Sequence, residues 1–144
     1  MDWNKLNFDE IGYYCKSTKN YVDFDCWPLR YQIEMLLGVL YYYEVYQFQI
    51  KDIQTLYAVL HIRKMRSDGI LAPQPKKLQT ILEKLAAEGR VIIEPDGYTI
   101  TDKNEEDRRN YIEEIERGYR EDYISGWIDY DKKNHMLKTE HLLL

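Results

Sequence analysis

The sequence has little that would support a disulfide scaffold or a membrane span. Only two cysteines, Cys15 and Cys26, occur in 144 residues, and their spacing matches neither a disulfide framework nor a zinc module. The longest uncharged apolar run, from Met35 to Tyr43, is bounded by glutamates and is far shorter than the roughly 20 residues that span a bilayer. No basic segment followed by an apolar one opens the chain. We therefore expect a cytoplasmic protein with no membrane partner.

The groups that enzymes and cofactor sites require are also scarce. The three histidines, His61, His135 and His141, do not have the spacing of metal ligands. The chain contains no glycine-rich phosphate loop and no nucleophile elbow, and the glutamates between residues 113 and 116 are typical of a solvated helix face. We expect no enzymatic activity, no metal and no cofactor.

Positive charge is in the minority, but it is unevenly distributed. The net charge is −5, yet residues 51–103 contain nine Lys and Arg against seven Asp and Glu, whereas residues 1–50 and 104–144 are acidic. Because screening limits the reach of distant charges to about 10 Å, a local basic patch can bind nucleic acid within an acidic protein.

The segment from Pro73 to Lys103 carries the clearest pattern. Its first part has apolar residues at i, i+3, i+4 and i+7, which is the stripe of an amphipathic helix: Leu78, Ile81, Leu82 and Leu85. Pro75 suits the first turn of this helix, and Gly89 suits the left-handed residue just past its end. The pattern predicts a helix over residues 75–88.

A hairpin is predicted directly after this helix. Residues 91–93 have strand propensity, Pro95-Asp96-Gly97 is a strong turn signal, and residues 98–100 resume an alternating strand.

The stretch EKLAAEGRVIIEPDGYTITDK resembles the recognition helix and wing of winged helix-turn-helix regulators such as the MarR and PadR-like groups. The resemblance implies a mainly α fold with a small β-hairpin (α+β), extended by an N-terminal arm and a C-terminal helix. It also implies a transcriptional regulator that reads the major groove of double-stranded DNA with helix 75–88. The side chains that would face the DNA are Gln74, Lys76, Lys77, Gln79, Thr80 and Lys84, with the wing tip near a flanking backbone.

Other readings of the same residues remain open. The lysines also suit an ordinary solvated helix face, and the wing carries Glu94 and Asp96 without a cation at its tip. Residues 67–74 make the preceding turn longer than in a compact helix-turn-helix. The alternative function is therefore a winged-helix protein–protein interaction module in an assembly or mobile-element factor, without DNA binding.

Upstream, Pro28 opens an apolar segment that we interpret as a helix followed by a short strand over residues 46–50. Asp52 is then expected to be the N-cap of a helix with an apolar stripe, and a second basic cluster closes that helix. This cluster, which could clamp the DNA backbone or compensate the helix dipole, consists of Arg63, Lys64 and Arg66.

The flanking segments divide the chain into four predicted parts. Residues 1–27 form an aromatic arm that packs on the domain or on a second subunit, residues 28–103 the winged-helix domain, residues 104–130 a C-terminal helix, and residues 131–144 a tail. Asp102 and Glu105 resemble a capping box for the C-terminal helix.

The C-terminal helix is expected to dimerise the protein. Ile112, Ile115 and Tyr119 form an apolar stripe too narrow to be buried in a core alone, so we expect a homodimer through this stripe and the aromatic segments. The tyrosines at positions 41–43 and 46 suit packing in a core or dimer better than stacking on single-stranded bases.

Overall fold

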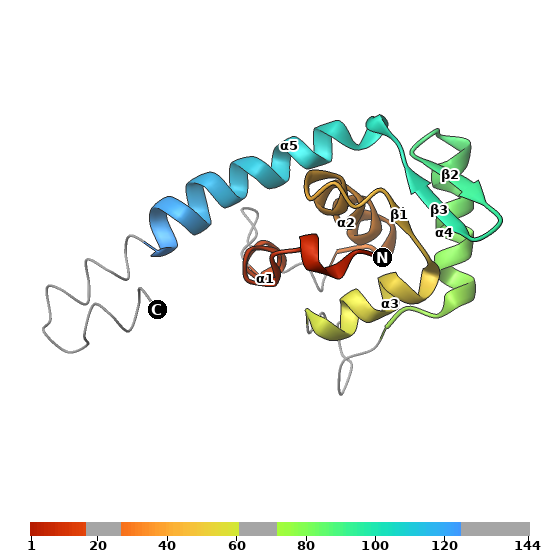
Figure 1. The fold of residues 1–144 in the computed structure, drawn as a ribbon, viewed down its shortest axis with the longest axis horizontal. Helices are drawn as coiled ribbons and strands as arrows, with labels where there is room; N and C mark the ends of the chain where they lie inside the picture. Colours follow the sequence, from red (N-terminus) through yellow and green to blue (C-terminus); the bar gives the residue numbers. More distant parts are fainter. Residues whose placement is uncertain (17–26, 61–71, 125–144) are drawn as a thin grey trace, which may run out of the picture. The chain divides into compact units, whose positions relative to one another are not determined.

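The computed structural model describes residues 1–16, 27–60 and 72–124. Within these ranges, the side chains of Lys16 and of residues 120–124 are not described. It divides into two compact units, Met1–Tyr111 and Ile112–Leu144. The described chain is mainly helical with a small antiparallel sheet, which confirms the mainly α, α+β class (Figure 1). In chain order the elements are η1 (Trp3–Lys5), α1 (Phe8–Lys16), α2 (Leu29–Tyr42), β1 (Gln47–Phe48), α3 (Ile50–Val59), α4 (Pro75–Ala87), β2 (Val91–Glu94), β3 (Gly97–Ile100), η3 (Asp102–Asn104), α5 (Glu105–Glu114) and the π-helix η4 (Ile115–Ile124).

The sheet has three strands in the order β1-β3-β2. The predicted hairpin is confirmed, with Ile92 opposite Thr99 and Glu94 opposite Gly97. The predicted strand over residues 46–50 is shorter than expected, because only Gln47 and Phe48 pair with β3 and α3 begins at Ile50.

Helix α4 begins and ends where its sequence predicts. Pro75 occupies the first helical position, and Gly89 has a φ of +80°, the left-handed conformation that ends a helix. The main-chain N–H groups of Gly89 and Arg90 return to the carbonyls of Ala86 and Leu85 at 2.9 Å. This closure turns the chain into β2, so only the three residues 88–90 connect α4 to the hairpin.

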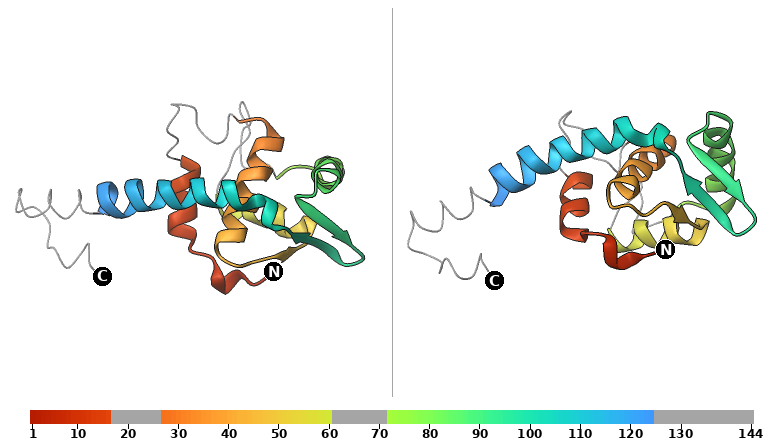
Figure 2. Two further views of the ribbon diagram at one scale, coloured as in Figure 1. Left: turned by 90° about the horizontal axis from the view of Figure 1, so that it is seen from above. Right: turned by 45° about the horizontal axis from the view of Figure 1, so that its top comes forward.

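The core of the first unit lies among α2, α3, α4 and the sheet. The fully buried aliphatic side chains include Ile33, Leu37, Ile53, Leu78, Leu82 and Leu85. Since α4 contributes three of these leucines from one stripe, its opposite face is left for solvent (Figures 1 and 2).

Two predicted helix caps are wrong. Asp52 is the third residue of α3 and not its N-cap. Its Oδ2 accepts a hydrogen bond from the N–H of Gln49 at 2.7 Å, and Gln49 is the N-cap, so the helix starts three residues earlier than predicted. Asp102 does not cap α5 either, because the Thr101 hydroxyl oxygen accepts from the N–H of Lys103 and begins the short helix η3.

The described part of the aromatic arm packs within the first unit. In α1, Ile11 and Cys15 are buried, the Tyr14 hydroxyl donates to the sulfur of Met35 at 3.1 Å, and Glu10 accepts from the Tyr43 hydroxyl at 2.9 Å. Of the two packing partners expected for the arm, the structure shows the domain itself.

The tyrosines pack mainly on one another. The rings of Tyr42 and Tyr43 both meet the ring of Tyr111 edge-on, at centroid distances of 5.4 and 5.8 Å. Burial raises the pKa of Tyr43 and of Tyr111, so both keep their protons and share a hydrogen bond of 2.6 Å. These tyrosines therefore pack in the core of the first unit.

Candidate nucleic-acid interface

The outer face of α4 brings the predicted DNA-facing residues together. The exposed side chains along the helix and its N-cap are Gln74, Lys76, Lys77, Gln79, Thr80, Glu83 and Lys84. Within the described part of the chain none of the three lysines forms an ion pair, so their charges are free to meet a ligand. The face therefore presents three cations, one carboxylate and three uncharged polar groups.

The first turn of α4 adds main-chain donors to these lysines. Pro75 has no N–H, and the side chain of the N-cap residue Gln74 makes no capping hydrogen bond. No described residue accepts a hydrogen bond from the N–H groups of Lys76 and Lys77, which lie at the positive end of the helix dipole. Such an end suits an anion such as a phosphate.

Gln79 and Thr80 differ in what they can offer to a base edge. The Thr80 hydroxyl donates to the carbonyl of Lys76 at 3.0 Å, so its oxygen can only accept from a ligand. The exposed amide of Gln79 can donate and accept at once, the combination that recognises adenine in the major groove.

Both ends of α4 are tied to neighbouring helices. At its start, Gln54 of α3 donates from Nε2 to the carbonyl of Pro73 at 3.0 Å. At its end, Arg30 of α2 forms an ion pair with Glu88 at 2.5 Å. These contacts connect α4 to α3 and α2.

A partly buried cluster around Arg90 lies where α4 passes into β2. The guanidinium donates to Glu34 at 2.8 Å, to the side-chain oxygen of Asn104 at 3.0 Å, and to Asp107. Burial raises the pKa of Asp107, while the hydrogen bond and charge of Arg90 oppose that rise. Sequence analysis did not single out Arg90, because a lone arginine after a helix-ending glycine carries no spacing signal.

The side chain of Asn104 joins the hairpin to the segment that follows it. It is fully buried, and its amide donates to the carbonyls of Arg90 at 2.8 Å and Thr101 at 3.0 Å. These bonds fasten the base of the hairpin to the start of α5.

The β2–β3 hairpin, which is the predicted wing, is acidic and apolar. Glu94 and Asp96 are exposed at its tip, and Ile92 and Ile93 on β2 are 53% and 52% exposed. Gly97 is required at the turn, since a Cβ there would lie 2.5 Å from the carbonyl oxygen of Phe48. This tip has no cation for a phosphate.

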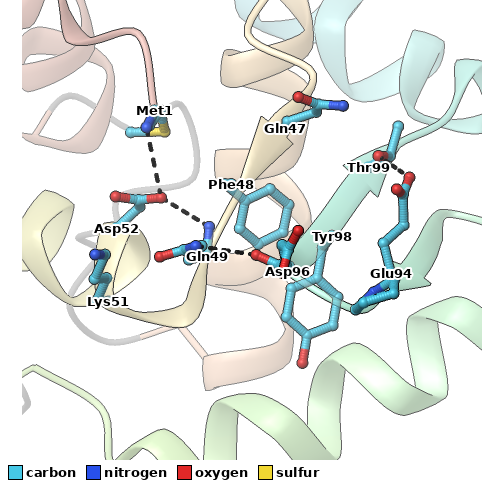
Figure 3. A pocket seen from close by; sticks show the side chains of 12 residues that line it. Met1, Gln47, Phe48, Gln49, Lys51, Asp52, Glu94, Asp96, Tyr98 and Thr99 are labelled. Atoms are coloured by element: carbon cyan, nitrogen blue, oxygen red, sulfur yellow. Dashed lines mark hydrogen bonds and ion pairs between the residues drawn. The ribbon is translucent and has the colours of Figure 1, made fainter.

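A pocket of about 460 Å³ lies between the wing tip, β1 and the start of α3 (Figure 3). Its lining includes the carboxyl groups of Asp52, Glu94 and Asp96 and a single lysine, Lys51. Gln49 spans the pocket edge and donates to the carbonyl of Asp96 at 3.0 Å. The carboxylates make this side of the wing unfavourable for an anion, in contrast to the outer face of α4.

Several predicted residues fall outside this site. Arg63, Lys64 and Arg66 lie outside the described residues, as do all three histidines and Cys26. Ile112 lies on α5 and Ile115 and Tyr119 on η4, all in the second unit, and dimerisation through them stays a prediction.

Among the described residues no group of His, Cys, Asp and Glu is arranged to hold a metal ion. Within the same ranges no helix combines the length and apolarity needed to cross a membrane. Comparison with protein-family models, curated proteins and solved structures finds no match to this chain.

Proposed function

We propose that this chain is a winged helix-turn-helix protein that binds double-stranded DNA through α4 and acts as a transcriptional regulator. The order helix, short strand, helix, helix and two-stranded wing, given by α2, β1, α3, α4 and the β2–β3 hairpin, supports this assignment. The pairing of β1 with β3 supports it further, because it joins the wing to the helical part.

The observation that carries the proposal is the free polar face of α4. A helix of this length extends for about 20 Å, and an α-helix fits the major groove of B-DNA. Lys76 and Lys77, together with their main-chain N–H groups, would hold a phosphate at the start of the helix. Gln79 and Thr80 would then face base edges, and Lys84 would reach the next backbone.

Removal of two α4 lysines tests this interface. For the double variant K76A/K77A we expect weaker binding to all duplexes, and the slope of log K against log salt should become shallower by roughly 2, because two phosphate contacts are lost. Fluorescence anisotropy with labelled genomic fragments at two or more salt concentrations measures both quantities.

The matched control is K5A/R109A, which removes the same charge from exposed residues of the N-terminal segment and α5. It should leave the slope unchanged if the interface is α4. Equal effects of both double variants, or binding by the wild type that does not depend on salt, would contradict the proposal.

The second candidate is a protein–protein interaction module without DNA binding. The exposed isoleucines of β2 and the acidic wing tip favour it, since an apolar patch beside carboxylates suits a protein surface better than a phosphate backbone. Failure of the folded wild type to bind any duplex at low salt would select this candidate.

A further inference from the structure

Arg90 joins the end of α4 and the start of β2 to three other elements. Its guanidinium bonds to Glu34 of α2 at 2.8 Å, to Asn104 of η3 at 3.0 and 3.3 Å, and to Asp107 of α5. The three side chains of the ion pairs are only 12–17% exposed. Because the guanidinium is a planar fork, these bonds fix its direction as well as its position.

The main chain of Arg90 takes part in the same junction. Its N–H donates to Leu85 in the last turn of α4 at 2.9 Å. Its carbonyl accepts from Thr101 at 3.2 Å and from Asn104 at 2.8 Å. One residue therefore links the last turn of α4, the base of the hairpin and the start of α5 through both main chain and side chain.

A second ion pair lies close by but is more exposed. Arg30 meets Glu88 at 2.5 Å and Glu34 at 3.6 Å, and the side chains of Arg30 and Glu88 are 40% and 47% exposed. Exposed pairs contribute little to holding a geometry, because water and salt screen them. The Arg90 cluster is thus the principal polar connection between the α4–β2 junction and the helices behind it.

We propose that Arg90 is a positioning residue for the outer face of α4. Its contacts determine how well the protein distinguishes one DNA sequence from another, but they do not determine its general affinity for DNA. Base edges must be met within about 0.5 Å, whereas a long lysine side chain follows a phosphate through larger shifts. Loosening the end of α4 therefore misplaces Gln79 and Thr80 while Lys76, Lys77 and Lys84 still reach the backbone. The inference rests on the proposed function.

The test compares two duplex probes bound by the full chain: the sequence that the wild type enriches from a randomised duplex library, and the unselected library. For R90M we expect the ratio of the two affinities to fall at least tenfold, with less than twofold change in affinity for the unselected library or in its salt slope. R90K keeps the charge but loses the fork, so it should fall between R90M and the wild type.

Hydrogen exchange without DNA measures the positioning itself. In R90K we expect the amides of Val91 and of the last turn of α4 to exchange at least tenfold faster, while those of α3 keep their rates. R108M is the matched control, because it breaks an arginine–carboxylate pair within α5, with Arg108 and Glu105 2.7 Å apart. It should change neither exchange at the junction nor the affinity ratio.

Three results would overturn the proposal. One is an unchanged affinity ratio in a folded R90M or, if R90M does not fold, in R90K. Another is an equal loss of affinity for both probes, which a merely structural role predicts. The third is an unchanged exchange rate at the junction in R90K, which refutes the positioning role whatever the chain binds. A wild type that binds no duplex refutes the proposed function instead.

Discussion

At the scale of single residues, the Arg90 cluster balances burial against charge. Asp107 is partly buried, which raises its pKa, and Arg90 provides the cation that keeps its carboxylate in place. A carboxyl whose folded pKa lies above its unfolded value binds more protons in the folded state. Its ionisation therefore lowers stability as the pH rises from about 3.8 through the raised pKa.

The variant D107N removes this ionisation. We expect D107N to be more stable relative to the wild type at pH 6 than at pH 3.5, because only the wild type bears the cost of a partly buried charge at pH 6. Urea unfolding at the two pH values measures the difference.

E105Q provides the contrast to D107N. The pKa of Glu105 is lowered by its hydrogen bond from Arg108, so its carboxylate stabilises the fold above its unfolded pKa. The relative stability of E105Q should change with pH in the opposite direction. The same direction in both variants would contradict the assignment of these environments.

At the scale of elements, α2 and α5 cross at a glycine. A Cβ on Gly38 of α2 would lie 2.5 Å from the Cβ of Asp107 and 2.8 Å from its carbonyl carbon. Since main-chain atoms of α5 cannot move aside cheaply, only glycine permits this approach. The close crossing places Asp107 where Arg90 reaches it.

Two glycine-to-alanine changes distinguish the effect of this close crossing on stability from the general effect of alanine on helix propensity. G38A should destabilise the fold by about 1–3 kcal/mol through overpacking. G12A, in α1, should stabilise it by up to about 1 kcal/mol, because nothing lies within 4 Å of the added Cβ and alanine favours a helix. Thermal unfolding of both variants checks this, and equal effects would exclude a close crossing.

At the scale of the whole molecule, charge divides the side proposed to face DNA into two parts. The outer face of α4 carries three lysines that form no ion pair with any described residue, whereas the wing tip and its pocket carry carboxylates. A duplex bound by α4 would thus meet attraction along the helix and repulsion at the wing, provided that the wing tip approaches the flanking backbone.

Reversing one charge on the wing tests this docking geometry. With D96K we expect at least a threefold gain in duplex affinity at low salt and a salt slope steeper by roughly 1, since a new lysine adds one phosphate contact. E106K, which makes the same change at an exposed residue of α5, is the control. Equal gains in both variants, in anisotropy titrations, would place the wing away from the DNA.

The elements that could be predicted are those set by nearby residues. The leucine spacing, Pro75 and Gly89 gave α4, and the Pro95–Gly97 turn gave the hairpin, because helix stripes, helix ends and tight turns depend on neighbours in sequence. The cap at Asp52 was mispredicted because a capping carboxylate can act from the third helical position as well as from the cap. The cap at Asp102 was mispredicted because the hydroxyl of the preceding residue, Thr101, takes the capping role.

The amino-acid sequence by itself determined the helix, its polar face and the hairpin that follows it. Only the tertiary structure decided that Arg90 bonds to Glu34, 56 residues earlier, that α5 crosses α2 at Gly38, and that α1 packs on the domain. The physical reason is distance along the chain: such contacts depend on how separate elements pack, and no local spacing records which side chains packing will bring together.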